Sequence, residues 1–325
     1  MKKWLIEHVV CPECIHSENG EADLMPEIMK DTEDDILEGS LRCTGCNSQY
    51  MIREGIAFIV PEKTLPHTKG STGYNSKSML SAYLWSHYAE FFDGPGGAGA
   101  SDATDAYQKW ASLFTQTHGW ALDIGCSVGR LAFELSRTHS RVIGVDTSST
   151  FIKKARQILK DRQLRFDLII EGHITEERSC ELDAAYHSDR VDFIVADAMA
   201  LPFRTGRFDT AASVNILEKV PHPVQHLKEV NRILQKNPGN FLFSDPFSWD
   251  ESVSDPDLWL SGRNSGPGKG RGMANICRIM AEDRDVFDPG FTIEATGDVL
   301  WKIRKTQHLW EHITSQFIFG RRDHH

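Results

Sequence analysis

The stretch at residues 121–130, "ALDIGCSVGR", has the pattern of an apolar strand that turns through glycines into a helix. Gly125 and Gly129 stand at that turn, where glycine lets the backbone approach a ligand closely and the helix start offers free N–H groups. Asp146 ends the next apolar segment, "RVIGVD", at roughly the 20-residue spacing found in nucleotide-binding folds. A carboxylate at that position can accept hydrogen bonds from both hydroxyls of a ribose. The pattern therefore predicts a nucleoside-binding edge on a parallel sheet.

Strand-like and helix-like segments alternate on both sides of this turn. Apolar strands are expected at 120–124, 141–145, 191–196, 210–217 and 240–245, with amphipathic helices at 129–139, 149–162 and 223–235. Strands separated by helices of this length form parallel β-α-β units, so the expected fold class is α/β with a doubly wound, Rossmann-like sheet. Segments 169–190 and 248–272 interrupt the alternation and are expected to be long irregular insertions, which are more often functional than idle.

Four motifs in this order over residues 119–246 resemble the class I S-adenosylmethionine-dependent methyltransferases. They are the turn with its acid, "FIVADAMALPF", "GRFDTAASVNILEKVPHP" and "LKEVNRILQKNPGNFLFSDP". The resemblance implies an S-adenosylmethionine site in which Asp197 meets the adenine amino group and Asn215 lies beside the transferable methyl. The residues it assigns to the cofactor are Asp123, Gly125, Cys126, Gly129, Asp146, Thr147, Asp197, Ala198 and Asn215. Cys126 itself is read as a small packing residue rather than a nucleophile.

A narrower resemblance runs from about residue 79 to 322. "MLSAYLWSHYAEFF", "IIEGHITEE", "DPFSWDESVSDPDLWLSG" and "WKIRKTQHLW" resemble the methyltransferase domain of ovothiol biosynthesis, which methylates an imidazole nitrogen of mercaptohistidine. This resemblance implies a small acceptor that carries an imidazole or a thiol. Two features depart from it: no iron-dependent sulfoxide synthase precedes the domain, and the insertion 263–285 differs. The acceptor can therefore have changed on the same scaffold.

Candidate acceptor residues come from three segments. Tyr83 and His87 are four residues apart in a helix-like stretch and share one face, so we expect this helix to cover the acceptor pocket, with His87 as base or hydrogen-bond donor. The alternative is that this aromatic face only packs. Arg304 can clamp a carboxylate or be a solvated surface arginine. The expected catalytic residues are His87, Tyr83 and Asn215, and the expected acceptor-binding residues are Tyr83, His87, Tyr88, Asp245, Trp249, Trp259 and Arg304. The two tryptophans can equally be ordinary core residues.

Four cysteines near the start form two Cys-x-x-Cys pairs, Cys11 with Cys14 and Cys43 with Cys46. Four thiolates suit a tetrahedral zinc ion with no position left for water, so a structural site is expected. Redox pairs, disulfides and an iron site are the alternatives. "HVVCPEC" and "LRCTGCNSQYMIREGIAFIV" resemble the small zinc-ribbon activator that partners tRNA and protein methyltransferases, which implies a protein contact through the ribbon.

Composition narrows the partners. The 325-residue chain carries a net charge of −10, which disfavours nucleic acid as a default ligand. No apolar run is long enough to span a membrane, no signal peptide is evident, and the cysteine usage fits a reducing compartment, so a cytoplasmic protein is expected.

The sequence thus predicts three units and one leading function. The units are a zinc ribbon at 1–61, a linker with covering helices at 62–118, and a methyltransferase domain at 119–325. The leading function is methyl transfer from S-adenosylmethionine to a small molecule. The alternatives are a tRNA or protein methyltransferase and a non-catalytic cofactor-binding scaffold.

Overall fold

The computed structural model describes residues 1–17, 20–64, 73–92, 103–114 and 119–322. The glycine-rich stretch 93–100 and most of the expected linker lie outside the described residues. The strands are β1 (Leu24–Asp31), β2 (Ile36–Cys43), β3 (Gln49–Arg53), β4 (Ile56–Ile59), β5 (Trp120–Ile124), β6 (Arg141–Asp146), β7 (Gln163–Glu171), β8 (Ile174–Glu181), β9 (Val191–Ala196), β10 (Thr210–Val214), β11 (Gly239–Asp245), β12 (Thr292–Arg304) and β13 (Trp310–Arg322). The α-helices are α1 (Pro12–Ile15), α2 (Lys77–Tyr88), α3 (Ala106–Ser112), α4 (Arg130–Leu135), α5 (Ser149–Asp161), α6 (Pro223–Ile233) and α7 (Gly272–Glu282). Short 3-10 turns cover Lys3–His8, Gly73–Asn75, Ala89–Phe91, Ser188–Arg190, Leu217–Lys219 and Pro256–Leu258.

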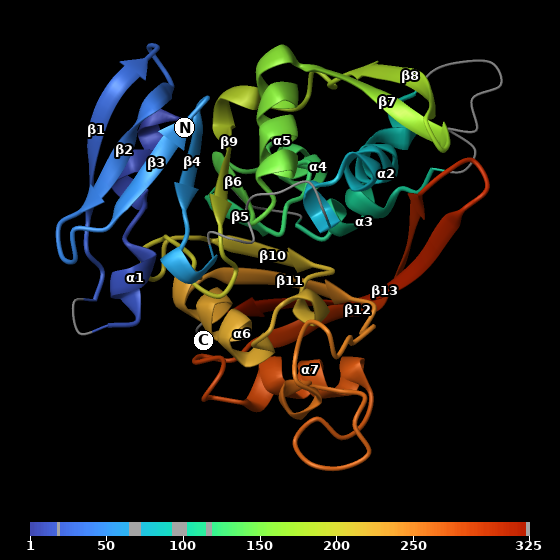
Figure 1. The fold of residues 1–325 in the computed structure, drawn as a ribbon. Coiled ribbons are helices and arrows are strands. Elements are labelled where there is room, and N and C mark those ends of the chain that lie inside the picture. The colour runs from blue at the N-terminus through green and yellow to red at the C-terminus, as the bar shows by residue number, and fades with distance from the viewer. Residues whose placement is uncertain (18–19, 65–72, 93–102, 115–118, 323–325) are drawn as a thin grey trace.

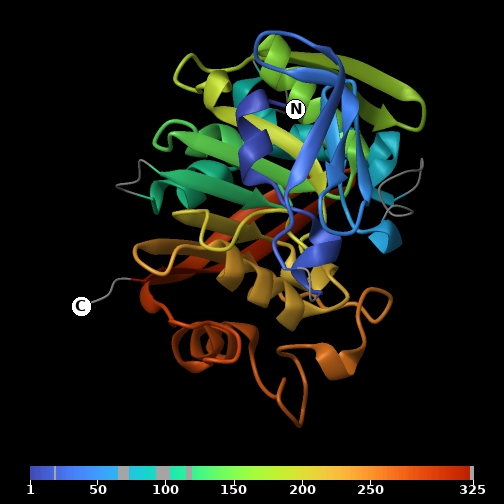
Figure 2. The same ribbon diagram turned by 90° about the vertical axis from the view of Figure 1, so that its left-hand side faces the viewer.

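One large sheet organises the described chain, in the order β1-β2-β3-β4-β9-β6-β5-β10-β11-β13-β12. From β4 to β11 the neighbouring strands run parallel, and β13 and β12 complete that side antiparallel. The chain moves outward from β5 to β6 and β9, then returns to place β10 on the other side of β5 (Figures 1 and 2). This confirms the doubly wound α/β fold. It also puts a topological switch point between β5 and β10, where such sheets bind ligands.

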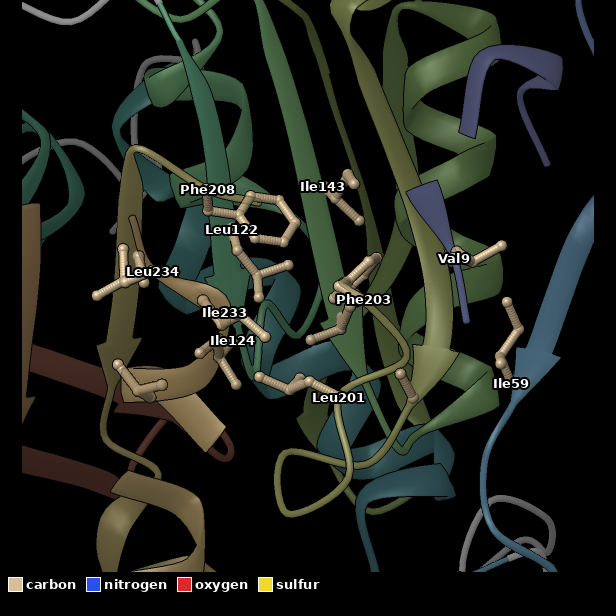
Figure 3. Packing of buried hydrophobic residues seen from close by; sticks show 14 of the residues in the cluster. Val9, Ile59, Leu122, Ile124, Ile143, Leu201, Phe203, Phe208, Ile233 and Leu234 are labelled. Atoms are coloured by element: carbon tan, nitrogen blue, oxygen red, sulfur yellow. The ribbon is translucent and has the colours of Figure 1, made fainter. Parts of the chain in front are cut away.

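Helices cover both faces of the sheet and create two apolar cores. Helices α2 to α5 pack on one face, and α6 and α7 pack on the other (Figure 1). Side chains of one strand alternate between the two cores, because successive residues point to opposite faces. In β5, for example, Ala121 faces the first core while Leu122 and Ile124 face the second, where they pack near Phe208 and Ile233 (Figure 3).

The cysteine-bearing segment extends this sheet. Strand β4 pairs parallel with β9, with Phe58 opposite Val195 and Ile59 opposite Ala196. Most buried apolar residues of the segment, including Val9 and Ile59, belong to the same apolar cluster as the α6 side of the sheet, whereas Ile56 and Val60 belong to the core on the other face (Figure 3). The sheet and that core therefore join the residues before position 61 to those after it. The domain boundary expected at residue 61 remains a prediction.

One of the two expected insertions differs from the expectation, and the other agrees with it. Residues 163–181 form the two-stranded antiparallel hairpin β7–β8, so most of the segment expected to be irregular is regular. Gly172 makes its turn with φ of 54°, and the hairpin packs beside α2, where Ser81 donates to the carbonyl of Asp167. By contrast, 248–271 holds only a single 3-10 turn and is irregular as expected.

Candidate active site

A cavity of about 840 Å³ opens at the carboxyl ends of β5, β6, β9 and β10, at the switch point of the sheet. Its volume lies in the range of roughly 300–1,000 Å³ that is typical of small-molecule sites. Ten of the predicted site residues line it: Tyr83, His87, Asp123, Gly125, Cys126, Asp146, Thr147, Asp197, Ala198 and Asn215. Sequence segments from residue 83 to residue 215 therefore meet at one place.

The glycine turn after β5 has no room for larger residues. Gly125 has φ of 73°, and a Cβ atom there would lie 2.3 Å from Cδ1 of Ile216. Gly129 has φ of 86°, and its Cβ would lie 2.5 Å from the ring of Phe193. Gly129 is a backbone pivot behind the cavity rather than part of its wall. The turn thus brings bare backbone to the cavity at Gly125.

Two carboxyl groups from neighbouring strand ends face this turn. Asp146 accepts hydrogen bonds from the backbone N–H of Ser127 at 3.0 Å and of Ser148 at 2.7 Å. Burial raises the pKa of Asp146 to about 6. Asp123 is 2% exposed, and its Oδ2 has no hydrogen-bond partner among the described residues. Burial, and then the charge of Asp146, raise the pKa of Asp123 to about 7. A buried carboxyl oxygen without a partner is costly unless a ligand completes it.

The end of β9 forms the next part of the wall. Asp197 accepts from the Thr64 hydroxyl at 2.7 Å and from the Met199 backbone N–H at 2.9 Å. The carbonyl of Ala198 lies 3.2 Å from Nδ1 of the buried His226, whose Nε2 is 2.8 Å from the Ser213 hydroxyl. These bonds fix the strand end. Thr64, which no sequence motif had indicated, therefore holds the residue expected to contact adenine.

Aromatic rings from four elements enclose another part of the cavity. Tyr83 of α2 packs against Phe151 of α5 with ring centroids 5.0 Å apart, and against Trp301 of β12 at 5.9 Å. The ring of Tyr107 from α3 lies 4.5 Å from that of His87. We call Tyr83, His87, Tyr107, Phe151 and Trp301 the aromatic box; all five line the cavity. The shared face of α2 predicted from the spacing of Tyr83 and His87 is thus observed at the cavity.

The polar centre of the aromatic box is a hydrogen bond of 2.7 Å between the Tyr107 hydroxyl and Nε2 of His87. Burial, and then the positive charge of Arg130, hold the pKa of His87 well below its usual value. Burial also raises the pKa of Tyr107 well above its usual value. Both groups are therefore neutral near pH 7, and the imidazole can accept or share a proton through the hydroxyl.

Asn215 and Lys219 complete the wall after β10. Asn215 has φ of 58°, and its Oδ1 accepts from the Ser315 hydroxyl of β13 at 2.7 Å. Its backbone N–H donates to the carbonyl of Ser244 at 2.7 Å. A left-handed backbone at a residue other than glycine is uncommon and is concentrated at functional sites. Lys219 forms an ion pair of 2.9 Å with Glu218.

Five of the predicted acceptor residues lie outside the cavity lining. The Tyr88 hydroxyl donates to the Val128 carbonyl at 2.9 Å in the core. Trp249 and Trp259 stack on each other with centroids 5.9 Å apart inside the loop 248–271. Arg304 is 4% exposed, with Nε donating to the Thr306 carbonyl at 3.3 Å, so it is neither at the cavity nor a solvated surface residue.

Asp245, the fifth of these, lies behind the cavity at the end of β11. It is fully buried, its Oδ1 accepts from the Phe247 backbone N–H at 2.7 Å, and its Oδ2 has no partner among the described residues. Burial, and then the charge of Glu218, raise its pKa to about 8. Asp245 therefore does not line the cavity itself. It interacts electrostatically with Glu218 and with Lys219, and Lys219 lines the cavity.

Several cavity residues carry no sequence signal of their own. Tyr74, Tyr107, Lys219 and Trp301 line the cavity from four separate segments. Tyr74, Tyr107 and Trp301 share neither a motif nor a helical or strand spacing with the predicted residues. Lys219 lies within the motif "GRFDTAASVNILEKVPHP", but nothing in that motif singles it out. Only the fold brings them together, because α3 and β12 both contact the α2 side of the sheet.

The four predicted metal ligands also converge. The sulfur atoms of Cys11, Cys14, Cys43 and Cys46 all lie within 4.8 Å of one another. The sulfur of Cys11 is 3.6 Å from that of Cys46, and the sulfur of Cys14 is 3.6 Å from that of Cys43. Tetrahedral zinc–thiolate bonds of about 2.3 Å place sulfurs roughly 3.8 Å apart, so this arrangement fits such an ion. All four cysteines are free of disulfides. The Sγ atom of Cys43 also accepts from the backbone N–H groups of Gly45 at 3.3 Å and Cys46 at 3.4 Å, as metal-bound thiolates commonly do.

A match to known proteins covers the strand ends that build the cavity. Residues 122–243 match a methyltransferase domain. The matched range begins in β5, ends in β11, and includes the glycine turn, Asp146, Asp197 and Asn215. The match therefore falls on the residues that form the cofactor side of the cavity.

Individual relatives match over shorter lengths. An uncharacterized 37.1 kDa protein in transposon TN4556 of Streptomyces fradiae is 30% identical over 145 residues, which cover 43% of this chain and 34% of that protein. A demethylmenaquinone methyltransferase of Lactococcus lactis subsp. lactis (strain IL1403) is 27% identical over 117 residues, covering 35% and 37%. The matched segment thus spans about a third of the length of these relatives.

Among solved structures, the magnesium protoporphyrin IX methyltransferase of Synechocystis PCC 6803 with bound S-adenosylhomocysteine is 15% identical, with a TM-score of 0.46. The alignment covers 77% of this chain and 96% of that one. The domain match is thus to a methyltransferase domain, and the relative from Lactococcus lactis is a methyltransferase by its name. Every helix among the described residues falls short of the length and apolar character needed to cross a bilayer.

Proposed function

We propose that this chain transfers a methyl group from S-adenosylmethionine to a small molecule. The observation that carries the proposal is that one cavity joins a cofactor-type strand edge at Asp123 and Asp146 to an enclosed aromatic box. The free oxygen of Asp123 and the bare backbone at Gly125 fit a nucleoside-bearing cofactor. When bound, S-adenosylmethionine supplies an electrophilic methyl on its sulfonium sulfur.

The roles of the cofactor-side residues follow from their chemistry. Asp146, at the end of β6, accepts hydrogen bonds from the ribose hydroxyls. Asp197 and Ala198 hold the adenine, and Gly125 with Cys126 lets the backbone approach. Asp123 binds the amino-acid end, Asn215 lies beside the transferable methyl, and Gly129 shapes the turn from behind. Apart from Gly129, all of these residues line the cavity.

The aromatic box defines the acceptor in this proposal. Flat aromatic walls favour a planar or sulfur-bearing acceptor, because ring stacking and sulfur–aromatic contacts both stabilise it. An imidazole or thiol of an amino-acid derivative fits that description. The relative from Lactococcus lactis is named as a methyltransferase of demethylmenaquinone, which is also a small molecule. His87 and Tyr107 hold the acceptor by a hydrogen bond and take up its proton when it has one to lose.

The four cysteines hold a structural zinc ion in this proposal. Their fourfold thiolate set leaves no open position, so the ion stabilises the segment rather than reacting. The segment then braces the catalytic sheet through β4, and its outer face is left for a protein contact.

The direct experiment measures methyl transfer from labelled S-adenosylmethionine to a panel of imidazoles, thiols and hydroxylated aromatic rings. We expect turnover on at least one small acceptor. The rate should fall at least about tenfold in Tyr107→Phe, because that change removes the hydroxyl that is hydrogen-bonded to His87. Unchanged binding of S-adenosylhomocysteine in Tyr107→Phe serves as its control. Activity on tRNA or protein alone would refute the proposal.

A further inference from the structure

A second cavity, of about 730 Å³, lies between the cysteine-bearing segment and the catalytic unit. Five parts of the chain build its walls: α1 with its following residue His16, residues 61–63 after β4, residues 199–200 after β9, the start of α6, and the loop 256–267. Short polar contacts hold these walls together. Nε2 of His16 lies 3.4 Å from the Glu229 carboxylate on α6, and the Glu13 carboxylate accepts from the Glu62 backbone N–H at 2.7 Å.

The two cavities adjoin each other. Lys63, Met199 and His222 line both of them, so the two cavities share one wall. The Gln225 side chain donates to the Met199 carbonyl at 3.4 Å and fixes that shared wall to α6. The second cavity is therefore the immediate neighbour of the first.

The lining of the second cavity is mainly apolar. It includes four proline rings and the side chains of Val224, Leu258, Trp259 and Leu260. Val224 and Leu258 are 38% and 41% exposed, which is high for large apolar side chains. Adjacent apolar side chains left open to water in a cavity are typical of a binding site for an apolar group.

Positive charge lies beside this apolar lining. Lys63 and Lys228 both line the cavity, and neither forms an ion pair with any described residue. Of the two acidic side chains in the lining, Asp257 is paired with Arg263, and Glu13 is hydrogen-bonded to the backbone. In a chain with a net charge of −10, two unpaired lysines at one cavity favour an anionic ligand group.

We propose that the second cavity binds the non-reacting arm of the methyl acceptor, and that this arm is an apolar chain that carries an acidic group. The inference rests on the proposed function, because it assigns the arm to the same acceptor. It makes α1, and with it the cysteine cluster beside it, part of the substrate-binding wall. The acceptor is then a small amphipathic acid rather than a compact amino acid.

Dodecanoate, kept below micelle-forming concentrations, is the probe for this site. The full chain, saturated with S-adenosylhomocysteine, is titrated with dodecanoate by calorimetry. We expect saturable one-to-one binding, and weaker or no binding of dodecyltrimethylammonium, whose charge is opposite. Leu258→Asp should weaken dodecanoate binding by about tenfold or more, because it removes apolar contact and adds a repelling charge. Lys228→Glu should weaken it by several-fold.

The matched control is Leu300→Asp, because Leu300 is 45% exposed but lies on β12 outside the cavity. It should bind dodecanoate as the unmodified chain does. Absence of saturable dodecanoate binding, or equal weakening in Leu258→Asp and Leu300→Asp, would overturn the inference. Binding of S-adenosylhomocysteine is measured first on the same samples. Its loss in the unmodified chain would count against the proposed function, whereas its presence without dodecanoate binding counts against the arm site alone.

Discussion

At the scale of single residues, the surroundings of Asp146 set the orientation and the pKa of a carboxyl group that is proposed to bind the cofactor. Two backbone N–H groups orient its carboxyl at the end of β6, and burial raises its pKa to about 6. The ionised form is the better acceptor for hydroxyl groups, because both oxygens then accept hydrogen bonds. Cofactor binding should therefore depend on pH in the range where this group titrates.

We predict that the affinity for S-adenosylhomocysteine falls as the pH drops through about 6. Below that value Asp146 is protonated, and the ligand must compete with the proton. Calorimetric titrations between pH 5 and 8 would measure the change. Asp146→Asn should bind weakly and lose this pH dependence; a normal pH profile in Asp146→Asn would show that another group is responsible.

Asp123 gives a prediction on stability. Its pKa in the fold, about 7, lies well above the ordinary value of an aspartate, so folding favours the protonated carboxyl. The stabilisation from this group is full at low pH and is lost as the pH rises through about 7. Asp123→Asn should therefore raise the melting temperature of the unliganded protein at pH 8 while weakening S-adenosylhomocysteine binding. A lower melting temperature in the variant at pH 8 would contradict this account.

At the scale of elements, the strand and helix pattern around β5, β6, β9 and β10 is readable in the sequence, and the aromatic box is not. Gly125 and Asp146 are found from spacing, because strand ends and their turns repeat in a fixed order. Tyr107 and Trp301 come from elements almost 200 residues apart, and only the packing of α3 and β12 near α2 brings them together. The hairpin β7–β8 was not predicted, although Leu164, Phe166 and Leu168 of β7 alternate along the strand and pack against an apolar core. Strand β8 is polar and mostly exposed, and it has no such face.

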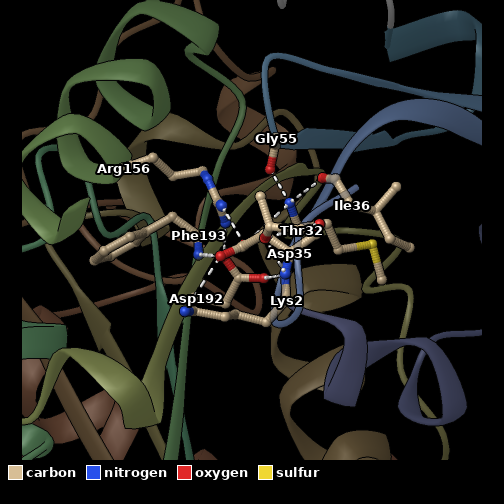
Figure 4. A network of polar contacts seen from close by, with 9 residues as sticks. Lys2, Thr32, Asp35, Ile36, Gly55, Arg156, Asp192 and Phe193 are labelled. Carbon is tan, nitrogen blue, oxygen red and sulfur yellow. Dashed lines mark hydrogen bonds and ion pairs between the residues drawn. The ribbon is translucent and has the colours of Figure 1, made fainter. Parts of the chain in front are cut away.

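The junction between α5 and the cysteine-bearing segment is held by a buried ionic network (Figure 4). Arg156 of α5 contacts the carboxylates of Asp35 and Asp192. Asp192 is fully buried in β9 and also accepts from the Lys2 backbone N–H at 2.6 Å. Removing the guanidinium leaves a buried carboxylate without its cation, which is strongly destabilising.

We therefore predict that Arg156→Ala lowers stability by about 3 kcal/mol or more. Lys153→Ala is the matched control: Lys153 also joins α5 to that segment, pairing with Glu54 at 2.5 Å, but both side chains are 64% exposed. Such an exposed pair contributes about 0–1 kcal/mol, so its loss should change the melting temperature little. Both substitutions are measured by thermal unfolding. Equal effects would show that the ionic network is not the main contact between α5 and the cysteine-bearing segment.

At the scale of the whole molecule, one sheet and one of its cores run from the cysteine-bearing segment into the catalytic unit. Because β4 pairs with β9, loosening that segment exposes the edge of the central sheet close to Asp197. The proposed zinc ion would then stabilise the entire chain rather than a separate module. The sequence predicted the four ligands but not this continuity, because strand pairing between distant segments leaves no local pattern.

We predict that Cys43→Ser loses the bound metal and lowers the melting temperature by about 5 °C or more, because metal binding contributes directly to the folding free energy. Metal content by elemental analysis and thermal unfolding would be measured together. Cys277→Ser, which changes a cysteine outside the cluster, should retain both. Full thermal stability in unmodified protein that contains no metal would exclude the structural role.

The central claim, that the cavity at the switch point is an S-adenosylmethionine site, is tested most directly by titrating the full chain with S-adenosylhomocysteine in a calorimeter. The structure predicts saturable one-to-one binding that is lost in Gly125→Val, because a side chain there would collide with Ile216 in a backbone conformation that favours glycine. No saturable binding to the unmodified chain, or unchanged binding in a folded Gly125→Val variant, would contradict it.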